Sequence, residues 1–278
     1  MTSPAAFQHI RVGDIDVFAL LDSRISGPRA LFPDAEKPGA DTSFGPGPFV
    51  IDVNCFAIRT GGKLYLVDAG SGPWRGEPGQ LLPAMRAARL DPAEVDAILM
   101  THMHGDHAGG LTTPEGAAFP KAELRLAEDE AEFWSDPGLP ARAPERMQAT
   151  IATAQRSFAA YEGRTTPFAW DSEVAPGVTA VALPGHTPGH TGFRIESGGE
   201  HLFIWADIVH AAAVQFPHPD WTIVFDIDGR QAAETRARIF AQCAAEGTRV
   251  AGSHLPFPGI GNVRATDAGF AWLAEPLD

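Results

Sequence analysis

The most constraining feature of the sequence is a run of metal-binding residue types directly behind an apolar segment. Residues 95–110 read VDAILMTHMHGDHAGG, so three histidines and an aspartate fall within six residues. In an extended segment side chains alternate, which turns His102 and His104 to the same side. Asp106 and His107 lie beyond the intervening glycine and can turn toward a neighbouring point. One short loop can therefore supply ligands to two metal ions.

Three later segments carry the same signature, a strand-like apolar run that ends in a potential ligand. VTAVALPGHTPGH contains His186, HLFIWAD ends in Asp207, and TRVAGSH ends in His254. In open α/β sheets, sites assemble in the crevice beyond the strand ends. We therefore expect these distant residues to converge on the histidine cluster, which gives five histidines and two aspartates.

Seven such groups suit two divalent ions about 3.5–4 Å apart. Zinc is the expected metal, and iron, cobalt and manganese accept the same nitrogen and oxygen donors. A purely structural ion is disfavoured, because closed structural zinc sites are usually rich in cysteine. The predicted ligands are His102, His104 and His186 for one ion, Asp106, His107 and His254 for the other, and Asp207 as the bridge between them.

Charge and composition exclude several classes of partner. The formal net charge is −14 at pH 7 and Lys and Arg do not cluster, so neither a nucleic acid nor an anionic membrane is expected as a partner. No apolar run approaches the ~20 residues of a membrane-spanning helix, and residues 1–14 lack the apolar stretch of a signal peptide. We therefore expect a cytoplasmic location. Cys55 and Cys243 lie far apart, and we expect both to be buried and unpaired.

The pattern of apolar residues predicts alternating strands and helices, and we expect one domain over residues 1–278. The segment 135–144 is rich in proline and is expected to form a surface loop or lid. We expect strands at residues 15–23, 56–70 (a hairpin folded at Gly61-Gly62), 95–100, 122–127, 178–183, 201–207 and 248–253, and helices at 80–89, 128–134, 145–161 and 229–247.

Two segments, one in each half of the sequence, resemble one another. FAIRTGGKLYLVD at residues 56–68 resembles FRIESGGEHLFIWAD at residues 193–207 in its apolar positions, its Gly-Gly turn and its final aspartate. Either a duplicated half-fold or two unrelated hairpins with the same turn chemistry would explain the likeness.

At the histidine motif, and again at GHTPGH, WAD and GSH, the sequence resembles the metallo-β-lactamase superfamily. The resemblance covers nearly the whole chain. It implies an α/β fold, the αβ/βα four-layer sandwich, with a two-metal site along one edge of the paired sheets. Asp68, in VDAG, falls where the superfamily often keeps an aspartate that supports a metal ligand.

A closer resemblance is to the branch with lactonases, arylesterases and methyl parathion hydrolase-like enzymes, carried by EAEFW, AAVQFPHPDWTIVFD and HLPFPGIGNVRA. Three residues after the bridging aspartate, homoserine lactonases typically carry tyrosine and parathion hydrolases leucine. This chain has His210, which either hydrogen-bonds or protonates a substrate oxygen or merely packs at the pocket rim. Trp134 is either a pocket residue or a core residue, and Phe216 and Phe257 are further candidates for the substrate pocket.

The resemblance implies a binuclear-metal hydrolase of lactones or aryl esters that uses a metal-bridging hydroxide, with phosphotriesters as promiscuous substrates. The catalytic residues would be Asp106, Asp207 and His210. Three alternatives stay open: a primary organophosphorus triesterase of the methyl parathion type, a thioesterase of glyoxalase II type, and a non-catalytic metal-binding regulatory protein. Relatives in this branch are commonly homodimers, which makes a homodimer an expectation here.

Overall fold

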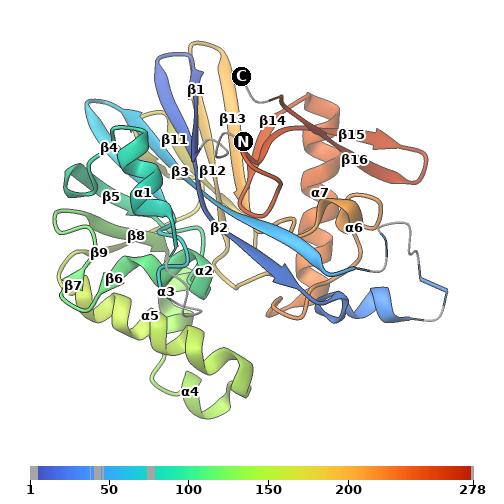
Figure 1. Cartoon of the computed structure of the whole chain (residues 1–278), viewed down its shortest axis with the longest axis horizontal. Coiled ribbons are helices and arrows are strands. Elements are labelled where there is room, and N and C mark those ends of the chain that lie inside the picture. Colours follow the sequence, from blue (N-terminus) through green and yellow to red (C-terminus); the bar gives the residue numbers. More distant parts are fainter. Residues whose placement is uncertain (1–5, 38, 41–44, 46, 74–78, 277–278) are drawn as a thin grey trace.

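The computed structural model describes residues 6–37, 39–40, 45, 47–73 and 79–276. Within them the chain forms two seven-stranded sheets and a small ribbon of β6 (Thr112–Thr113) and β7 (Gly116–Ala117). Figure 1 shows helices on the outside of both sheets. The helices beside the first sheet are α1 (Leu81–Ala87), α3 (Glu128–Ser135) and α5 (Gln148–Ala160), and the helix beside the second is α7 (Gly229–Glu246).

The first sheet is built from the N-terminal part of the chain. Its first four strands pair antiparallel, and from β4 onward its neighbours pair parallel. Parallel neighbours need crossover connections, and α1, α2 (Gly105–Ala108), α3, α4 (Leu139–Arg142) and α5 lie in those crossovers. The strand order is β1 (Phe7–Val12), β2 (Ile15–Gly27), β3 (Phe49–Thr60), β4 (Lys63–Val67), β5 (Val95–Leu99), β8 (Glu123–Ala127) and β9 (Thr165–Phe168).

The second sheet has one parallel pair, β13 with β14, and α6 (Ala212–Gln215) and α7 lie in the connection between these two strands. Its other neighbours pair antiparallel. The strand order is β10 (Glu173–Ala175), β11 (Val178–Ala182), β12 (Thr191–Ser197), β13 (Glu200–Ala206), β14 (Arg249–Gly252), β15 (Ile260–Thr266) and β16 (Gly269–Ala274).

Strand alternation distributes the apolar side chains over separate layers. In β2, Val17 and Ala19 belong to the core between the two sheets, whereas Phe18 and Leu20 belong to the core under α1, α3 and α5. A third core lies between the second sheet and α7. The αβ/βα four-layer sandwich is thus confirmed. Cys55 and Cys243 are buried and free, as expected.

The two hairpins with similar sequences occupy corresponding places in the two sheets. They are β3–β4 and β12–β13, and each is followed in its sheet by a parallel strand. Both turns use a Gly-Gly pair with positive φ, 58° and 74° at Gly61 and Gly62 and 59° and 83° at Gly198 and Gly199. Positive φ at both central positions matches the twist of the flanking strands.

The expected loop at residues 135–144 contains the short helix α4. Single 3-10 turns at Arg29–Leu31, Pro33–Glu36, Pro92–Glu94, Gly109–Leu111 and Glu145–Met147 complete the described secondary structure. Among the described helices, none combines the length and the apolar character needed to cross a membrane.

Candidate metal centre

The predicted metal ligands lie just beyond the carboxyl ends of strands from both sheets. Because β4 runs parallel to β5, and β13 to β14, the loops that follow each pair emerge at a common edge. The ligand loops follow β5 with His102, His104, Asp106 and His107, β11 with His186, β13 with Asp207, and β14 with His254.

Three histidines form the first group of potential ligand atoms. The distance from His102 Nε2 to His104 Nδ1 is 3.1 Å, and His104 Nδ1 lies 2.9 Å from His186 Nε2. All three atoms lie within 4.8 Å of one another, close enough to share one ion. His102 and His104 come from the loop after β5 and His186 from the loop after β11, so the two sheets meet at this group.

Asp106, His107 and His254 form the second group, also within 4.8 Å. Asp106 Oδ2 lies 3.5 Å from His254 Nε2. Asp207 lies between the groups: its Oδ2 is 3.3 Å from His186 Nε2 and 3.0 Å from His254 Nε2. The structure therefore brings all seven predicted ligands together, with Asp207 in contact with both groups.

The donor atoms fit divalent cations. His107 Nε2 and Asp207 Oδ1 are buried and lie 3.2 Å apart, but neither makes a well-aligned hydrogen bond with a described residue, and buried polar atoms of this kind call for a partner. Burial lowers the pKa of His102 and of His104 well below 6.5. Both imidazoles are thus neutral, and the neutral form is the one that binds a metal.

Electrostatics favours positive charge around Asp207. Burial raises the pKa of this carboxyl, but the imidazoles of His107 and His254 outweigh burial and hold the pKa well below 3.8. Burial lowers the pKa of His186, while hydrogen bonds to Asp207 and Asp226 raise it, with the balance at about 9. The His186 ring lies between two carboxylates, with Asp226 at Nδ1 and Asp207 at Nε2, so a proton or a cation is favoured at Nε2.

Asp68 lies directly behind β4, with a left-handed φ of 62°. Its Oδ2 lies 2.8 Å from His107 Nδ1 and accepts from Thr101 Oγ1, and its Oδ1 accepts from Thr101 N. A carboxylate on Nδ1 fixes the tautomer of the ring and leaves Nε2 free to bind a metal. Asp68 thus contacts a predicted ligand, and its role in supporting a metal ligand stays a prediction.

Asp226 makes the same kind of contact with His186, and this residue was not among those predicted from the sequence. Its Oδ1 lies 2.8 Å from His186 Nδ1, and its Oδ2 accepts from Ile223 N. A signal was present, because Asp226 ends the apolar run WTIVFD in the way that Asp68 and Asp207 end theirs.

His190, the second histidine of GHTPGH, was also missed. Its Nε2 accepts a hydrogen bond from Asp207 N at 3.2 Å, so Nδ1 carries the proton that is donated to Leu183 O at 2.9 Å. Burial lowers the pKa of His190 to about 3, which keeps the ring neutral. The ring thereby holds the backbone of Asp207, which follows Ala206 at a left-handed φ of 48°.

Glu130 connects the two ligand loops from α3. Its fully buried carboxylate accepts from Met103 N at 2.8 Å and Trp134 Nε1 at 2.6 Å, and from Thr187 Oγ1 at 2.6 Å and Gly189 N at 3.1 Å. Burial raises its pKa, and these four donors oppose that shift. The sequence offered no signal, because an acid in the first turn of a helix is ordinarily a solvated residue.

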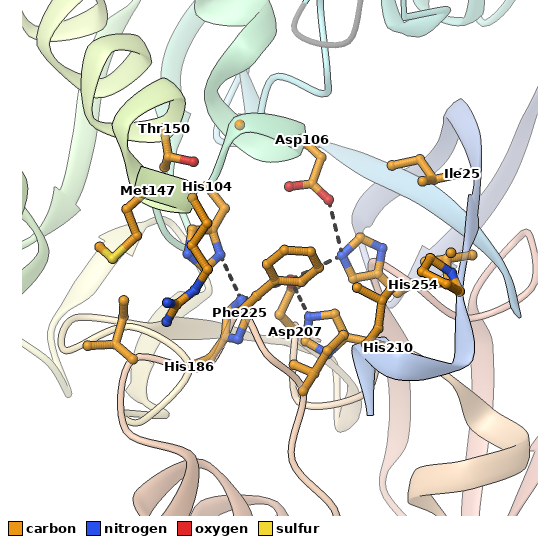
Figure 2. Close-up of a pocket in the computed structure, with 18 of the residues that line it drawn as sticks. Ile25, His104, Asp106, Met147, Thr150, His186, Asp207, His210, Phe225 and His254 are labelled. Atoms are coloured by element: carbon orange, nitrogen blue, oxygen red, sulfur yellow. Dashed lines mark hydrogen bonds and ion pairs between the residues drawn. The ribbon is translucent and has the colours of Figure 1, made fainter. Parts of the chain in front are cut away.

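A cavity of ≈150 Å³ opens onto this cluster, and Figure 2 shows His104, Asp106, His186, Asp207 and His254 around it. Its other walls are mainly apolar. The apolar lining residues are Ile25, Gly27, Pro28, Leu31, Ile51, Met147, Ile223, Phe225 and Ile227.

His210 lies on the cavity wall next to Asp207, as Figure 2 shows. Its Nε2 is 3.1 Å from Asp207 Oδ2, and its ring stacks on that of His254 with 5.0 Å between centroids. His186, Asp207 and His210 also form a group within metal-binding distance. Burial lowers the pKa of His210 to about 4. The residue thus adjoins the two groups of predicted ligands as well as the cavity.

The three aromatic residues expected in the substrate pocket do not line this cavity. Phe216 is 1% exposed and stacks on Phe240, with 4.6 Å between ring centroids, in the core under α7. Phe257 packs against the core between the sheets. Trp134 is fully buried behind His104, whose ring it contacts edge-on at 5.9 Å. Trp134 therefore packs from the core against a predicted ligand, and packing across layers places the other two away from the cavity.

Comparisons with known proteins agree with this geometry. An N-acyl homoserine lactonase of Bacillus sp. is 28% identical over 187 residues, and the match covers 58% of this chain and 66% of the lactonase, just under two thirds of its length. The crystal structure of the hydrolase AbOPH, of the beta lactamase superfamily, superposes with a TM-score of 0.88 at 32% identity and full coverage of both chains.

AidC, a dizinc quorum-quenching lactonase solved in complex with a product, N-hexanoyl-L-homoserine, superposes with the same TM-score of 0.88. It is 28% identical, and the alignment covers 98% of each chain. The family described as the metallo-beta-lactamase superfamily matches residues 49–254, which include all seven predicted ligands. The chain therefore belongs to the metallo-beta-lactamase superfamily.

Proposed function

We propose that this protein is a binuclear metal-dependent hydrolase of lactones or aryl esters. The observation that carries the proposal is the opening of a mainly apolar cavity onto two groups of buried donors that share Asp207. Such a cavity accepts a small molecule with a hydrocarbon part and places its polar centre at the cluster. The likeness to two lactonases, one of them a dizinc enzyme, supports the choice of lactones and of zinc.

His102, His104 and His186 would hold one cation, Asp106, His107 and His254 the other, and Asp207 would contact both. When bound, two such cations supply Lewis acidity, which acidifies a water molecule and polarises a substrate carbonyl. Asp68 and Asp226 keep the ligand nitrogens of His107 and His186 oriented toward the centre.

The chain's own groups orient the substrate and handle the leaving group. The apolar wall with Ile51, Ile223 and Phe225 holds the hydrocarbon part and excludes bulk water. His210 Nε2, 3.1 Å from Asp207 Oδ2, lies where it can donate a hydrogen bond to the oxygen that leaves when the ring or ester opens, while the neutral ring keeps its proton. The leaving alkoxide takes up the proton that the attacking water loses. The hydrogen bond matters most for alkoxides of high basicity, such as those released from lactones.

Metal analysis of the purified protein combined with a substrate panel tests the proposal. The panel contains a lactone such as dihydrocoumarin, an aryl ester and a paraoxon-type phosphotriester. We expect two equivalents of a divalent metal per chain, and turnover of the lactone or aryl ester above that of the phosphotriester. Hydrolysis that survives complete metal removal would exclude the proposed chemistry. A fully loaded protein that hydrolyses none of these substrates would instead favour a non-catalytic metal-binding role.

A further inference from the structure

One wall of the cavity carries a polar group that the described part of the protein leaves without a partner. Thr150, in the first turn of α5, lines the cavity, and the residue is only 7% exposed. Its hydroxyl makes no hydrogen bond with any described residue, and the oxygen is not sealed from solvent. In Figure 2 the hydroxyl extends from the helix on the side of Asp106.

Other hydroxyls on the same helix behave differently. Thr153 Oγ1 donates to Ala149 O at 3.0 Å, and Ser157 Oγ donates to Thr153 O at 2.9 Å. Such bonds to the carbonyl four residues earlier are the usual way in which a helix satisfies a buried hydroxyl. Thr150 does not use this option. Its donor capacity is therefore available to a molecule in the cavity.

Arg146 adds a cation to the same wall. It lies in the 3-10 turn Glu145–Met147 that leads into α5, four residues before Thr150, and it lines the same cavity. Its guanidinium is exposed and forms no hydrogen bond or ion pair with the described residues. Guanidinium groups only donate hydrogen bonds. This side of the cavity thus presents donors, whereas the side with Ile25, Ile51 and Ile223 is apolar.

We propose that Thr150 and Arg146 form a subsite for a second oxygen acceptor of the substrate, a carbonyl or carboxylate that is not the group being hydrolysed. This inference rests on the proposed function and specifies its substrate class. Preferred substrates are lactones or esters whose side chain carries such an acceptor, with the hydrocarbon part against the apolar wall. Thr150 supplies a neutral donor for either oxygen, and Arg146 adds charge that favours a carboxylate.

The test uses three γ-butyrolactones of matched size, with an alkyl, an amide-bearing and a carboxylate-bearing side chain. In Thr150→Val we expect KM for the two acceptor-bearing lactones to rise about 3- to 10-fold, the size of one neutral hydrogen bond, with kcat and the alkyl lactone unchanged. Valine matches threonine in shape and branching, so the helix is preserved. Thr150→Ser should keep the preference, and Arg146→Gln should raise KM chiefly for the carboxylate-bearing lactone.

Matched controls are Thr153→Val, whose hydroxyl is bonded within the helix, and Arg156→Gln, an exposed arginine of α5 outside this cavity. Neither control should alter the ranking of the three lactones. Equal effects of Thr150→Val on all three, or no effect on any, would overturn the subsite and leave the hydrolase intact.

Calorimetry with the three ring-opened hydroxy acids gives a readout that does not depend on turnover. Wild-type protein should bind the two acids with a second acceptor more tightly than the alkyl acid, and Thr150→Val should remove that difference for the amide. If no lactone is hydrolysed, the proposed function fails and calorimetry alone decides the subsite. Equal affinities of the wild type for all three acids would then overturn it.

Discussion

The Asp207 carboxylate lies among five imidazoles. His254 and His210 stand 3.0 and 3.1 Å from its Oδ2, His107 stands 3.2 Å from its Oδ1, and His186 and His102 stand 3.3 and 3.6 Å from its Oδ2. These contacts include His102 and His186 of the first ligand group and His107 and His254 of the second. Removal of Asp207 should thus affect both groups at once.

We expect Asp207→Ala to retain less of the second metal and to lower turnover by about 10²-fold or more, because even residues that only orient a ligand are worth 10- to 100-fold. Metal content per chain and kcat/KM measure the two effects. Asp129→Ala, which removes an exposed acid on α3, is the control for charge. Near-normal turnover with one metal bound would show that bridging by Asp207 is irrelevant.

The variant His210→Leu should lose more activity on lactones than on phosphotriesters. A lactone releases a basic alkoxide that is stabilised by a hydrogen-bond donor, whereas a paraoxon-type ester releases a nitrophenoxide that is already stabilised. We expect lactone kcat/KM to fall by about 10²-fold, the size of losing one hydrogen-bond donor to a developing oxyanion, and phosphotriester kcat/KM to change much less. His201→Leu, at an exposed position, should change neither. A uniform loss on both substrates would remove the assignment of His210 Nε2 as the hydrogen-bond donor to the leaving oxygen.

Single site residues could be predicted where their spacing is local or where they directly follow an apolar run. His102, His104, Asp106 and His107 could be predicted because their spacing is local, and the later ligands because each follows an apolar run. Glu130 could not, because its four donors come from Met103, Trp134, Thr187 and Gly189, which only the fold brings together. Phe216 and Phe257 were misplaced for a related reason: packing across layers decides which way an aromatic side chain turns.

Glu130 of helix α3 holds the loop after β5 and the loop after β11 together through its hydrogen bonds. Replacing Glu130 by Gln puts an amide NH₂ against four donors, so at least one buried donor loses its acceptor. We expect the free energy of unfolding to drop by about 1–3 kcal/mol, the cost of an unsatisfied buried group. Denaturant unfolding measures the loss, and Glu132→Gln, on the exposed side of the same helix, should be nearly neutral. Equal stability of the two variants would contradict the proposed role of Glu130 in connecting the two loops.

Helices and strands could be predicted where apolar residues recur at a regular spacing. Helix α7 and strands β5, β13 and β14 lie within a residue or two of their expected bounds. Strands β15 and β16 were not predicted, because Gly261, Asn262 and Arg264 interrupt the apolar pattern of β15. They are strands because β15 pairs with β14 and β16 pairs with β15, and such pairing depends on partners distant in the chain.

On the scale of the whole molecule, the metal centre lies where the two halves of the fold meet. The first sheet contributes His102, His104, Asp106 and His107, and the second contributes His186, Asp207 and His254. The corresponding hairpins β3–β4 and β12–β13 each lead toward this edge, since Asp68 and Asp207 directly follow them. Cations at this edge would therefore link the two halves of the sandwich in addition to taking part in hydrolysis.

This link makes metal content a determinant of global stability. A cation that binds the folded state stabilises it by RT ln(1 + [L]/Kd), about 4 kcal/mol at a free concentration 1,000 times Kd. We expect chelation to lower the melting temperature of the wild type and re-addition of zinc to restore it. In Asp207→Ala the same treatment should give a smaller shift, because fewer ligands connect the sheets. A melting temperature that is unchanged by complete metal removal would mean that the sheets hold together by their apolar cores alone, and that the cluster does not bind cations tightly enough to couple them.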